Sequence, residues 1–169
     1  PYIANPHEQL FFPLNVLVLL IPPDYLFLPL LIFFTFLAGA CMYALARRWL
    51  PPFPALIAAL PYKLSGALMT KIYNGVLSYF EILCLLPLLF LSMQFVYEKP
   101  TLRRMLGFTA VLALLLTINN VQLLLYSSTA VGVFLLAQLT YARWRNAPRV
   151  LLTVLAAGAL ATLLSAVVL

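Results

Sequence analysis

The amino-acid sequence predicts an all-α protein, a polytopic bundle of transmembrane helices. Of its 169 residues, 65% are hydrophobic and 8% are charged, whereas a soluble domain has about 25% charged residues. The mean hydropathy is +1.07, and apolar segments near the length of a membrane-spanning helix, about 20 residues, follow one another along the chain. Strands are not expected, because open strands leave backbone groups unsatisfied in lipid and no alternating ten-residue pattern occurs.

Six segments are long enough, or nearly so, to cross a membrane. They are residues 26–49, 53–69, 76–97, 102–118, 121–141 and 149–169. Pro148 suits the first turn of the last one, while Pro61 and Pro87 lie inside spans and are expected to kink them. Residues 1–169 are therefore expected to form a single transmembrane domain, in which residues 26–169 supply the six helices.

Residues 1–25 precede the first span and are expected to form an outer loop and a short interfacial helix. The apolar stretch 10–21 would be a helix of about 18 Å, too short to span a membrane. Phe11, Phe12 and Tyr25 are suited to anchor it at the interface. A loop ordered by neighbouring helices is the alternative. Because the chain stops inside an apolar run, we expect a fragment of a larger membrane protein.

Basic residues indicate the orientation. Eight of the ten follow the first, third or fifth predicted span: Arg47, Arg48, Lys99, Arg103, Arg104, Arg143, Arg145 and Arg149. Because cytoplasmic loops are enriched in Lys and Arg, this side is predicted to be cytoplasmic and the N-terminal segment extracytoplasmic. The charges form short clusters between apolar runs instead of a basic face, so a nucleic-acid partner is not expected.

Most other polar side chains gather on the predicted outer side. They are His7, Glu8, Gln9, Lys71, Tyr73, Asn74, Asn119, Asn120 and Gln122, with Lys63, Tyr79 and Glu81 slightly deeper. Since an ionisable group costs at least about 2.5 kcal/mol at mid-membrane, this one-sided distribution predicts a water-filled cavity that opens outward. The candidate substrate-binding residues are Gln9, Lys71, Asn74, Glu81, Asn119, Asn120 and Gln122.

Structural explanations for the same residues stay open. Lys63 and Glu81 lie at similar depth on consecutive antiparallel helices, so we expect them close enough to form an ion pair. Lys71 is also suited to be an anchor that extends its ammonium group to the interface. Asn119, Asn120 and Gln122 are also compatible with a simple polar turn between two spans.

Several motifs resemble those of YfhO-type bacterial membrane proteins, which belong to the C-type (GT-C) superfamily of polytopic glycosyltransferases. The stretches that carry the resemblance read ANPHEQLFFPLNVL, FLAGACMYALARRW, ALIAALPYKLSGAL, LLPLLFLSMQFV and LLLTINNVQLLLYSS. Matching positions are Asn5, Pro6, Gln9, Phe12, Pro13, Asn15, Ala38, Gly39, Met42, Tyr43, Arg47, Arg48, Leu64, Ser65 and Gly66. The last stretch keeps Gln122 and Tyr126 but lacks the glycine, histidine and proline usual in that turn.

The resemblance implies an enzyme of the bacterial cytoplasmic membrane that takes a sugar from a polyprenyl-phosphate donor at an outward-facing cavity. In this family an acid in the first outer loop serves as general base or metal ligand, and it would lie upstream of Pro1. Glu8 and His7 are then the candidate catalytic residues, with Glu8 as a second carboxylate. A solvated loop pair is the alternative for these two residues.

No cofactor is expected from the residues, although the resemblance leaves a divalent metal open. Cys41 and Cys84 lie inside apolar runs without metal-ligand spacing, so neither a disulfide nor a metal site is predicted. The expected partners are membrane lipid and the polyprenyl-phosphate-linked sugar.

Two other classes of function stay open. A transporter would also concentrate polar groups in a membrane cavity, but it often shows two related halves, and no internal repeat is present. A non-catalytic membrane scaffold would need no cavity and would show its polar side chains paired between helices.

Overall fold

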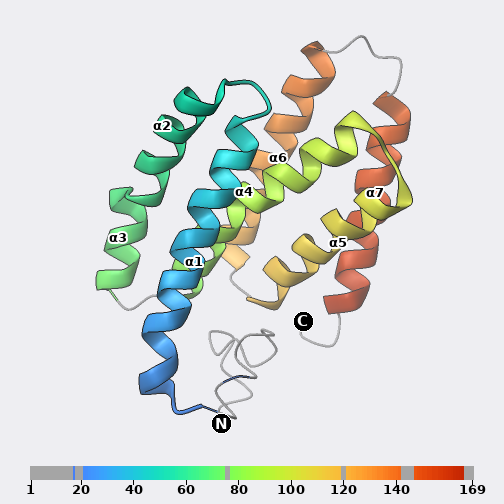
Figure 1. Cartoon of the computed structure of the whole chain (residues 1–169). Helices are drawn as coiled ribbons and strands as arrows, with labels where there is room; N and C mark the ends of the chain where they lie inside the picture. The colour runs from blue at the N-terminus through green and yellow to red at the C-terminus, as the bar shows by residue number, and fades with distance from the viewer. Residues whose placement is uncertain (1–16, 18–20, 75–76, 119–120, 142–146, 166–169) are drawn as a thin grey trace.

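The computed structural model describes residues 17, 21–74, 77–118, 121–141 and 147–165. These residues form seven α-helices (Figure 1). The helices are α1 Pro23–Ala46, α2 Pro52–Lys63, α3 Gly66–Tyr73, α4 Leu77–Glu98, α5 Leu102–Thr117, α6 Val121–Tyr141 and α7 Ala147–Ser165. The described part of the chain contains no strand, which confirms the predicted all-α class.

Three described segments are long and apolar enough to cross a membrane: Tyr25–Ala46, Leu77–Glu98 and Pro148–Ser165. A shorter apolar stretch, Leu124–Ala137, lies within α6. These helices support a helical membrane protein, while the number of six spans stays a prediction. The expected interfacial helix over residues 10–21 lies almost entirely outside the described residues.

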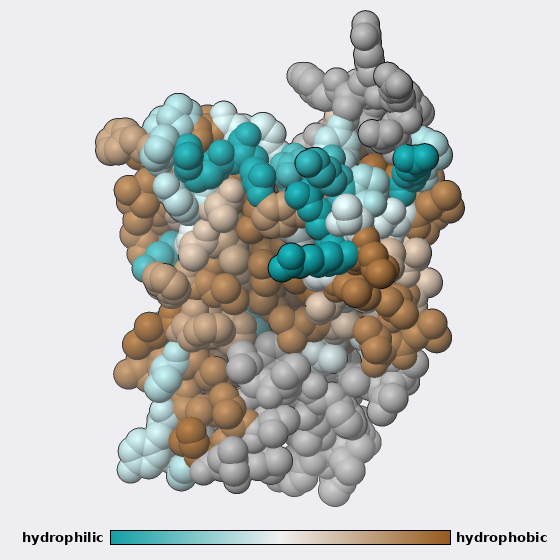
Figure 2. Space-filling model, turned by 45° about the vertical axis from the view of Figure 1, so that its right-hand side comes forward, coloured by the Kyte–Doolittle hydropathy of each residue, from teal (hydrophilic) through white to brown (hydrophobic). Residues whose placement is uncertain are grey.

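The chain runs back and forth between two ends of the bundle (Figure 1). We call one the basic end, which carries Arg47, Arg48, Lys99, Arg103, Arg104 and Arg149, and the other the opposite end, which carries Lys71, Asn74, Tyr79 and Gln122. Figure 2 shows hydrophilic residues gathered at the basic end, above a largely hydrophobic body. This arrangement has the alternation that the predicted topology requires, and the side of the membrane that each end faces stays a prediction.

Helix α4 is the centre of the bundle. It packs against α1, α3, α5, α6 and α7. Its buried residues are Phe80, Glu81, Ile82, Cys84, Leu85, Pro87, Leu89, Leu91, Met93, Gln94 and Val96. A helix that is apolar all round needs apolar surroundings. Helices α1 and α7 cover α4 and expose large apolar side chains such as Phe36, Leu152 and Leu163, as contact with lipid would require.

The second predicted span is not one helix, and this prediction was wrong. Instead of a continuous helix over residues 53–69, α2 ends at Lys63 and α3 starts at Gly66. The Ser65 side chain accepts a hydrogen bond from the Leu68 backbone N–H at 3.4 Å. Serine at this position caps a new helix, and glycine next to it is a poor residue for continuing the old one. The new helix then extends to Tyr73, four residues beyond the predicted end.

Pro87 lies inside α4 without ending the helix. Proline has no backbone N–H, so the carbonyl four residues earlier, that of Leu83, loses its helical partner. The Tyr62 hydroxyl of α2 donates a hydrogen bond to this carbonyl at 2.6 Å. A neighbouring helix therefore restores the bond that the proline removes, as prolines inside membrane helices require. Pro61 likewise leaves α2 intact as far as Lys63.

Candidate functional site

Four side chains at the opposite end form one connected group, which we call the rim cluster: Lys71, Tyr79, Gln122 and Tyr126. The Lys71 ammonium nitrogen lies 4.6 Å from the centre of the Tyr79 ring. The Tyr79 hydroxyl donates to Gln122 Oε1 at 2.9 Å, and Gln122 Nε2 donates to the Tyr126 hydroxyl oxygen at 3.2 Å. The cluster thus joins α3, α4 and α6 through a cation–π contact and two hydrogen bonds.

Secondary structure explains why α6 contributes two members of the cluster. Gln122 and Tyr126 are four residues apart in a helix, so they lie on the same face. Both side chains are exposed, and Tyr126 is 57% exposed. The Lys71 ammonium group supplies a positive charge with three donors, and the Tyr126 hydroxyl supplies another donor. This combination suits an anionic group such as a phosphate, for which lysine is a common ligand.

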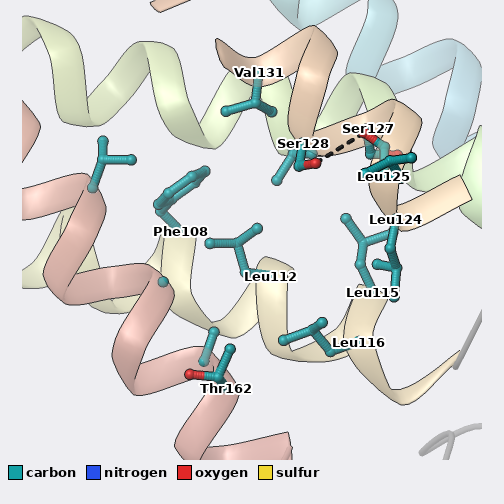
Figure 3. Close-up of a pocket in the computed structure, with 14 residues that line it drawn as sticks. Phe108, Leu112, Leu115, Leu116, Leu124, Leu125, Ser127, Ser128, Val131 and Thr162 are labelled. Carbon is teal, nitrogen blue, oxygen red and sulfur yellow. Dashed lines mark hydrogen bonds between the residues drawn. The ribbon is translucent and has the colours of Figure 1, made fainter. Parts of the chain in front are cut away.

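An apolar cavity of about 530 Å³ lies between α5, α6 and α7, and Leu89 of α4 also lines it. Its lining residues are Leu89, Phe108, Leu112, Leu115, Leu116, Leu124, Leu125, Ser127, Ser128, Val131, Val154, Gly158, Ala161 and Thr162 (Figure 3). The Ser128 hydroxyl donates to the Leu125 carbonyl at 2.9 Å, and that of Thr162 donates to the Ala159 carbonyl at 2.8 Å. Because these hydroxyls are bonded to their own helices, the cavity is chemically apolar, and its volume is within the range of small-molecule sites.

The cavity and the rim cluster both use helix α6, on different faces of it. In sequence Tyr126 lies between Leu125 and Ser127, which both line the cavity. With about 3.6 residues per turn, its side chain points away from the face that Leu124, Ser128 and Val131 turn to the cavity. The cavity residues of α6 run from Leu124 to Val131, those of α7 from Val154 to Thr162, and those of α5 from Phe108 to Leu116. The cavity therefore lies along the middle of the bundle and extends toward the opposite end. A charged rim and an apolar cavity are thus present on two sides of α6.

The structure brings together two of the predicted substrate-binding residues, Lys71 and Gln122, through Tyr79. Asn74 is the exposed C-cap residue of α3 at the same end, and its backbone N–H bonds to the Thr70 carbonyl. Glu81 is 6% exposed and belongs to the buried surface of α4. The predicted catalytic residues His7 and Glu8, and the predicted binding residues Gln9, Asn119 and Asn120, lie outside the described residues.

Lys63 packs differently from the prediction. Its aliphatic stem lies against α1, where a Cβ added to Gly39 would be 3.3 Å from Lys63 Cδ. The ion pairs among the described residues are Arg48–Glu98 and Arg104–Glu98, so the expected pair of Lys63 with Glu81 is not formed. Gly39 leaves room for the lysine stem, and this close approach to α1 explains the different position.

Sequence reasoning missed the apolar cavity and the Tyr62–Leu83 bond. The cavity has no local signal, because each lining residue resembles an ordinary apolar position of its own helix. The bond had a signal that was not used. A proline at position 87 implies a carbonyl without a helical partner at position 83, and a hydroxyl in a neighbouring span is a natural donor.

Among the described residues, no group of three or more His, Cys, Asp or Glu side chains is arranged to hold a metal ion. Comparisons with protein-family models, with curated proteins and with solved structures find no significant match for this chain. The functional argument therefore rests on the geometry of the rim cluster and the cavity.

Proposed function

We propose that this chain is the membrane-embedded part of a glycosyltransferase that takes a sugar from a polyprenyl-phosphate donor at the outer face of the bacterial cytoplasmic membrane. The observation that carries the proposal is that α6 bears residues of an apolar cavity as well as two members of the positively charged rim cluster, on two of its faces. A lipid-linked sugar phosphate has a charged headgroup and a long apolar chain. The rim cluster is complementary to the headgroup, and the cavity is complementary to the chain.

In this proposal Lys71 binds the phosphate of the donor, and Gln122 with Tyr126 orients its oxygens. Isoprene units further along the donor chain pass α6 and occupy the cavity between α5, α6 and α7. Departure of a phosphate leaving group is favoured by a nearby fixed positive charge, which Lys71 supplies. Activation of the acceptor hydroxyl needs a carboxylate within hydrogen-bond reach, and Glu8, with His7, is the candidate from this chain beside an acid expected upstream.

Filling the cavity tests the proposal. Gly158 lines the cavity, and a Cβ added there meets no atom within 4 Å, so Gly158→Leu places a side chain in the empty space. Gly132 of α6 is equally open but does not line the cavity, which makes Gly132→Leu a matched control. If the leucine excludes the lipid chain, binding loses the burial of an apolar group, about 1.5–3 kcal/mol. The Gly158 variant should then bind a polyprenyl-phosphate sugar at least about tenfold more weakly, and the Gly132 variant should bind it normally.

The assay uses the full-length protein, which would include the acid expected upstream, in proteoliposomes. It measures photo-crosslinking of a radiolabelled polyprenyl-phosphate sugar, followed by transfer of the label to an acceptor. In the Gly132→Leu control, polyprenol without phosphate should compete only weakly with the donor, which means that the site prefers the phosphorylated lipid. Lys71→Met should reduce this preference. Equal crosslinking of both glycine variants would refute the cavity as the chain site. Crosslinking without any transfer would refute the enzyme but retain the binding site.

One observation favours a second candidate, a non-catalytic membrane scaffold. Polar side chains are paired between helices, as Tyr79 with Gln122 and Arg48 with Glu98 show. A scaffold predicts that neither glycine variant changes lipid crosslinking, and that Gln122→Ala lowers thermal stability without any ligand-dependent effect. The same set of variants therefore separates the two candidates.

A further inference from the structure

Three helix ends meet at a single carboxylate at the basic end. The Arg48 guanidinium, after α1, lies 3.2 Å from Glu98 Oε1, and that of Arg104, in α5, lies 3.7 Å from Glu98 Oε2. Glu98 is the last residue of α4. We call Arg48, Phe95, Glu98 and Arg104 the arginine clamp. Two cations share one anion, so the clamp has an excess positive charge.

The Phe95 side chain and carbonyl hold the two guanidinium groups in place. The Arg48 Cζ atom lies 4.3 Å from the centre of the Phe95 ring, and the Arg104 Cζ atom lies 5.6 Å from it. Arg104 also donates to the Phe95 carbonyl at 2.7 Å. Each guanidinium has five N–H donors, and these contacts use the NH1 nitrogens of the two arginines. Other donors are left for a ligand.

The clamp is accessible and lies in a basic, partly aromatic surface. The Arg48 and Arg104 side chains are 32% and 31% exposed. Further basic residues at this end are exposed: Arg47, Lys99, Arg103 and Arg149. Trp49, which follows Arg48, and Leu102, which precedes Arg103, are 53% and 69% exposed. Figure 2 shows the hydrophilic end directly above the hydrophobic body, which is where lipid headgroups would lie around a spanning bundle.

We propose that the arginine clamp binds the headgroup phosphate of an anionic phospholipid, a site separate from the proposed donor site at the opposite end. Guanidinium groups match phosphate oxygens in a planar, two-point geometry, and pairs held in advance lose little freedom on binding. Clusters of basic residues at the membrane surface attract anionic lipids. Trp49 and Leu102 then contact the acyl chains of the bound lipid, which distinguishes this ligand from a soluble anion.

The experiment measures the thermal unfolding of the full chain in a neutral detergent with added lipid. A ligand that binds the folded state at about 100 times its Kd should raise the Tm of a protein of this size by about 5 to 10 °C. We expect this shift with phosphatidylglycerol and little shift with phosphatidylcholine. The variant Arg48→Gln/Arg104→Gln should lose most of the difference between the two lipids, whereas Lys63→Gln, a charge removed outside the clamp, should keep it.

Two additional arms keep the proposal testable if the double variant folds poorly. Glu98→Gln leaves both arginines and removes their competing carboxylate, so it should retain or increase the preference for phosphatidylglycerol. Glycerol phosphate without acyl chains should give less than half of the shift. Equal shifts with the two phospholipids, an unchanged preference in the double arginine variant, or an equal shift with glycerol phosphate would each overturn the proposal.

Discussion

The two ends of the bundle are joined by different chemistry. At the basic end, Arg48 and Arg104 meet Glu98, so charge joins three helix ends. At the opposite end, Tyr79 and Gln122 join α4 to α6 through a neutral hydrogen bond, with Lys71 on the ring of Tyr79. The charged contacts at one end are ionic and partly exposed. Those at the other end are hydrogen bonds and a cation–π contact, so the two ends should respond differently to salt.

Two polar contacts between the two ends are local in character. The Tyr62–Leu83 bond satisfies a carbonyl that Pro87 leaves free. Thr35 donates to the Leu31 carbonyl within its own helix. The middle of the bundle therefore depends mainly on apolar packing, and ionic strength should affect it much less than it affects the basic end.

The largest expected effect is an all-or-none difference in labelling between the two ends. In a background without Cys41 and Cys84, both of which are buried, single cysteines replace Asn74 and Lys99, both of which are exposed. If the predicted topology is right, an impermeant thiol reagent added outside intact cells labels the Asn74 variant and not the Lys99 variant, because the basic end faces inward. Labelling of both sites from outside would break the comparison between the two ends.

The next prediction concerns the ionic contacts of the basic end. Glu98→Ala leaves the two arginines without their shared partner and should lower the free energy of unfolding by about 1–2 kcal/mol at low salt, since partly exposed pairs contribute up to about 1 kcal/mol each. The loss should shrink as salt is added, because screening weakens the pairs. Denaturation in mixed micelles at two salt concentrations measures this. A loss that is independent of salt would mean that packing, not charge, joins these helix ends.

Tyr62→Phe should destabilise the protein by about 1 kcal/mol, near the upper part of the range for hydrogen bonds inside membrane proteins. The hydroxyl is the group that replaces the missing N–H of Pro87. In a Pro87→Ala background the alanine N–H can bond to the Leu83 carbonyl, so the same Tyr62→Phe change should cost much less. A double-mutant cycle measures this coupling. Equal costs in both backgrounds would show that the tyrosine does not compensate for the proline.

The smallest effect is expected at the rim cluster. Tyr79→Phe removes the donor to Gln122 but keeps the ring that Lys71 contacts, so the free energy of unfolding should fall by about 0.5 kcal/mol. This change should not depend on salt, in contrast to that of Glu98→Ala. Thermal unfolding of both variants in the same micelles makes the comparison direct. A salt-dependent loss for Tyr79→Phe would show that ionic interactions stabilise both ends of the bundle.

Local sequence features predicted much of the fold because they act within one helix. Apolar runs and prolines located most helices, although the second span is divided. The signal for the division was present in Ser65 and Gly66, since serine caps helices and glycine interrupts them. It was outweighed by the apolar residues on both sides. The polar residues Lys71, Tyr79 and Gln122 were predicted to lie at one end, because their depth follows from their distance to helix termini.

The sequence by itself determined the class of the protein, its alternation between two ends and the separation of basic from other polar residues. Composition and helix length decide these properties before any helix packs on another. Only the tertiary structure decided that Lys63 packs on Gly39, that Tyr62 bonds to Leu83 and that an apolar cavity forms between α5, α6 and α7. Such features depend on the rotation and spacing of neighbouring helices. Because these helices are apolar on all sides, many rotations of one helix against the next have similar free energy. The close packing of particular side chains selects one of them.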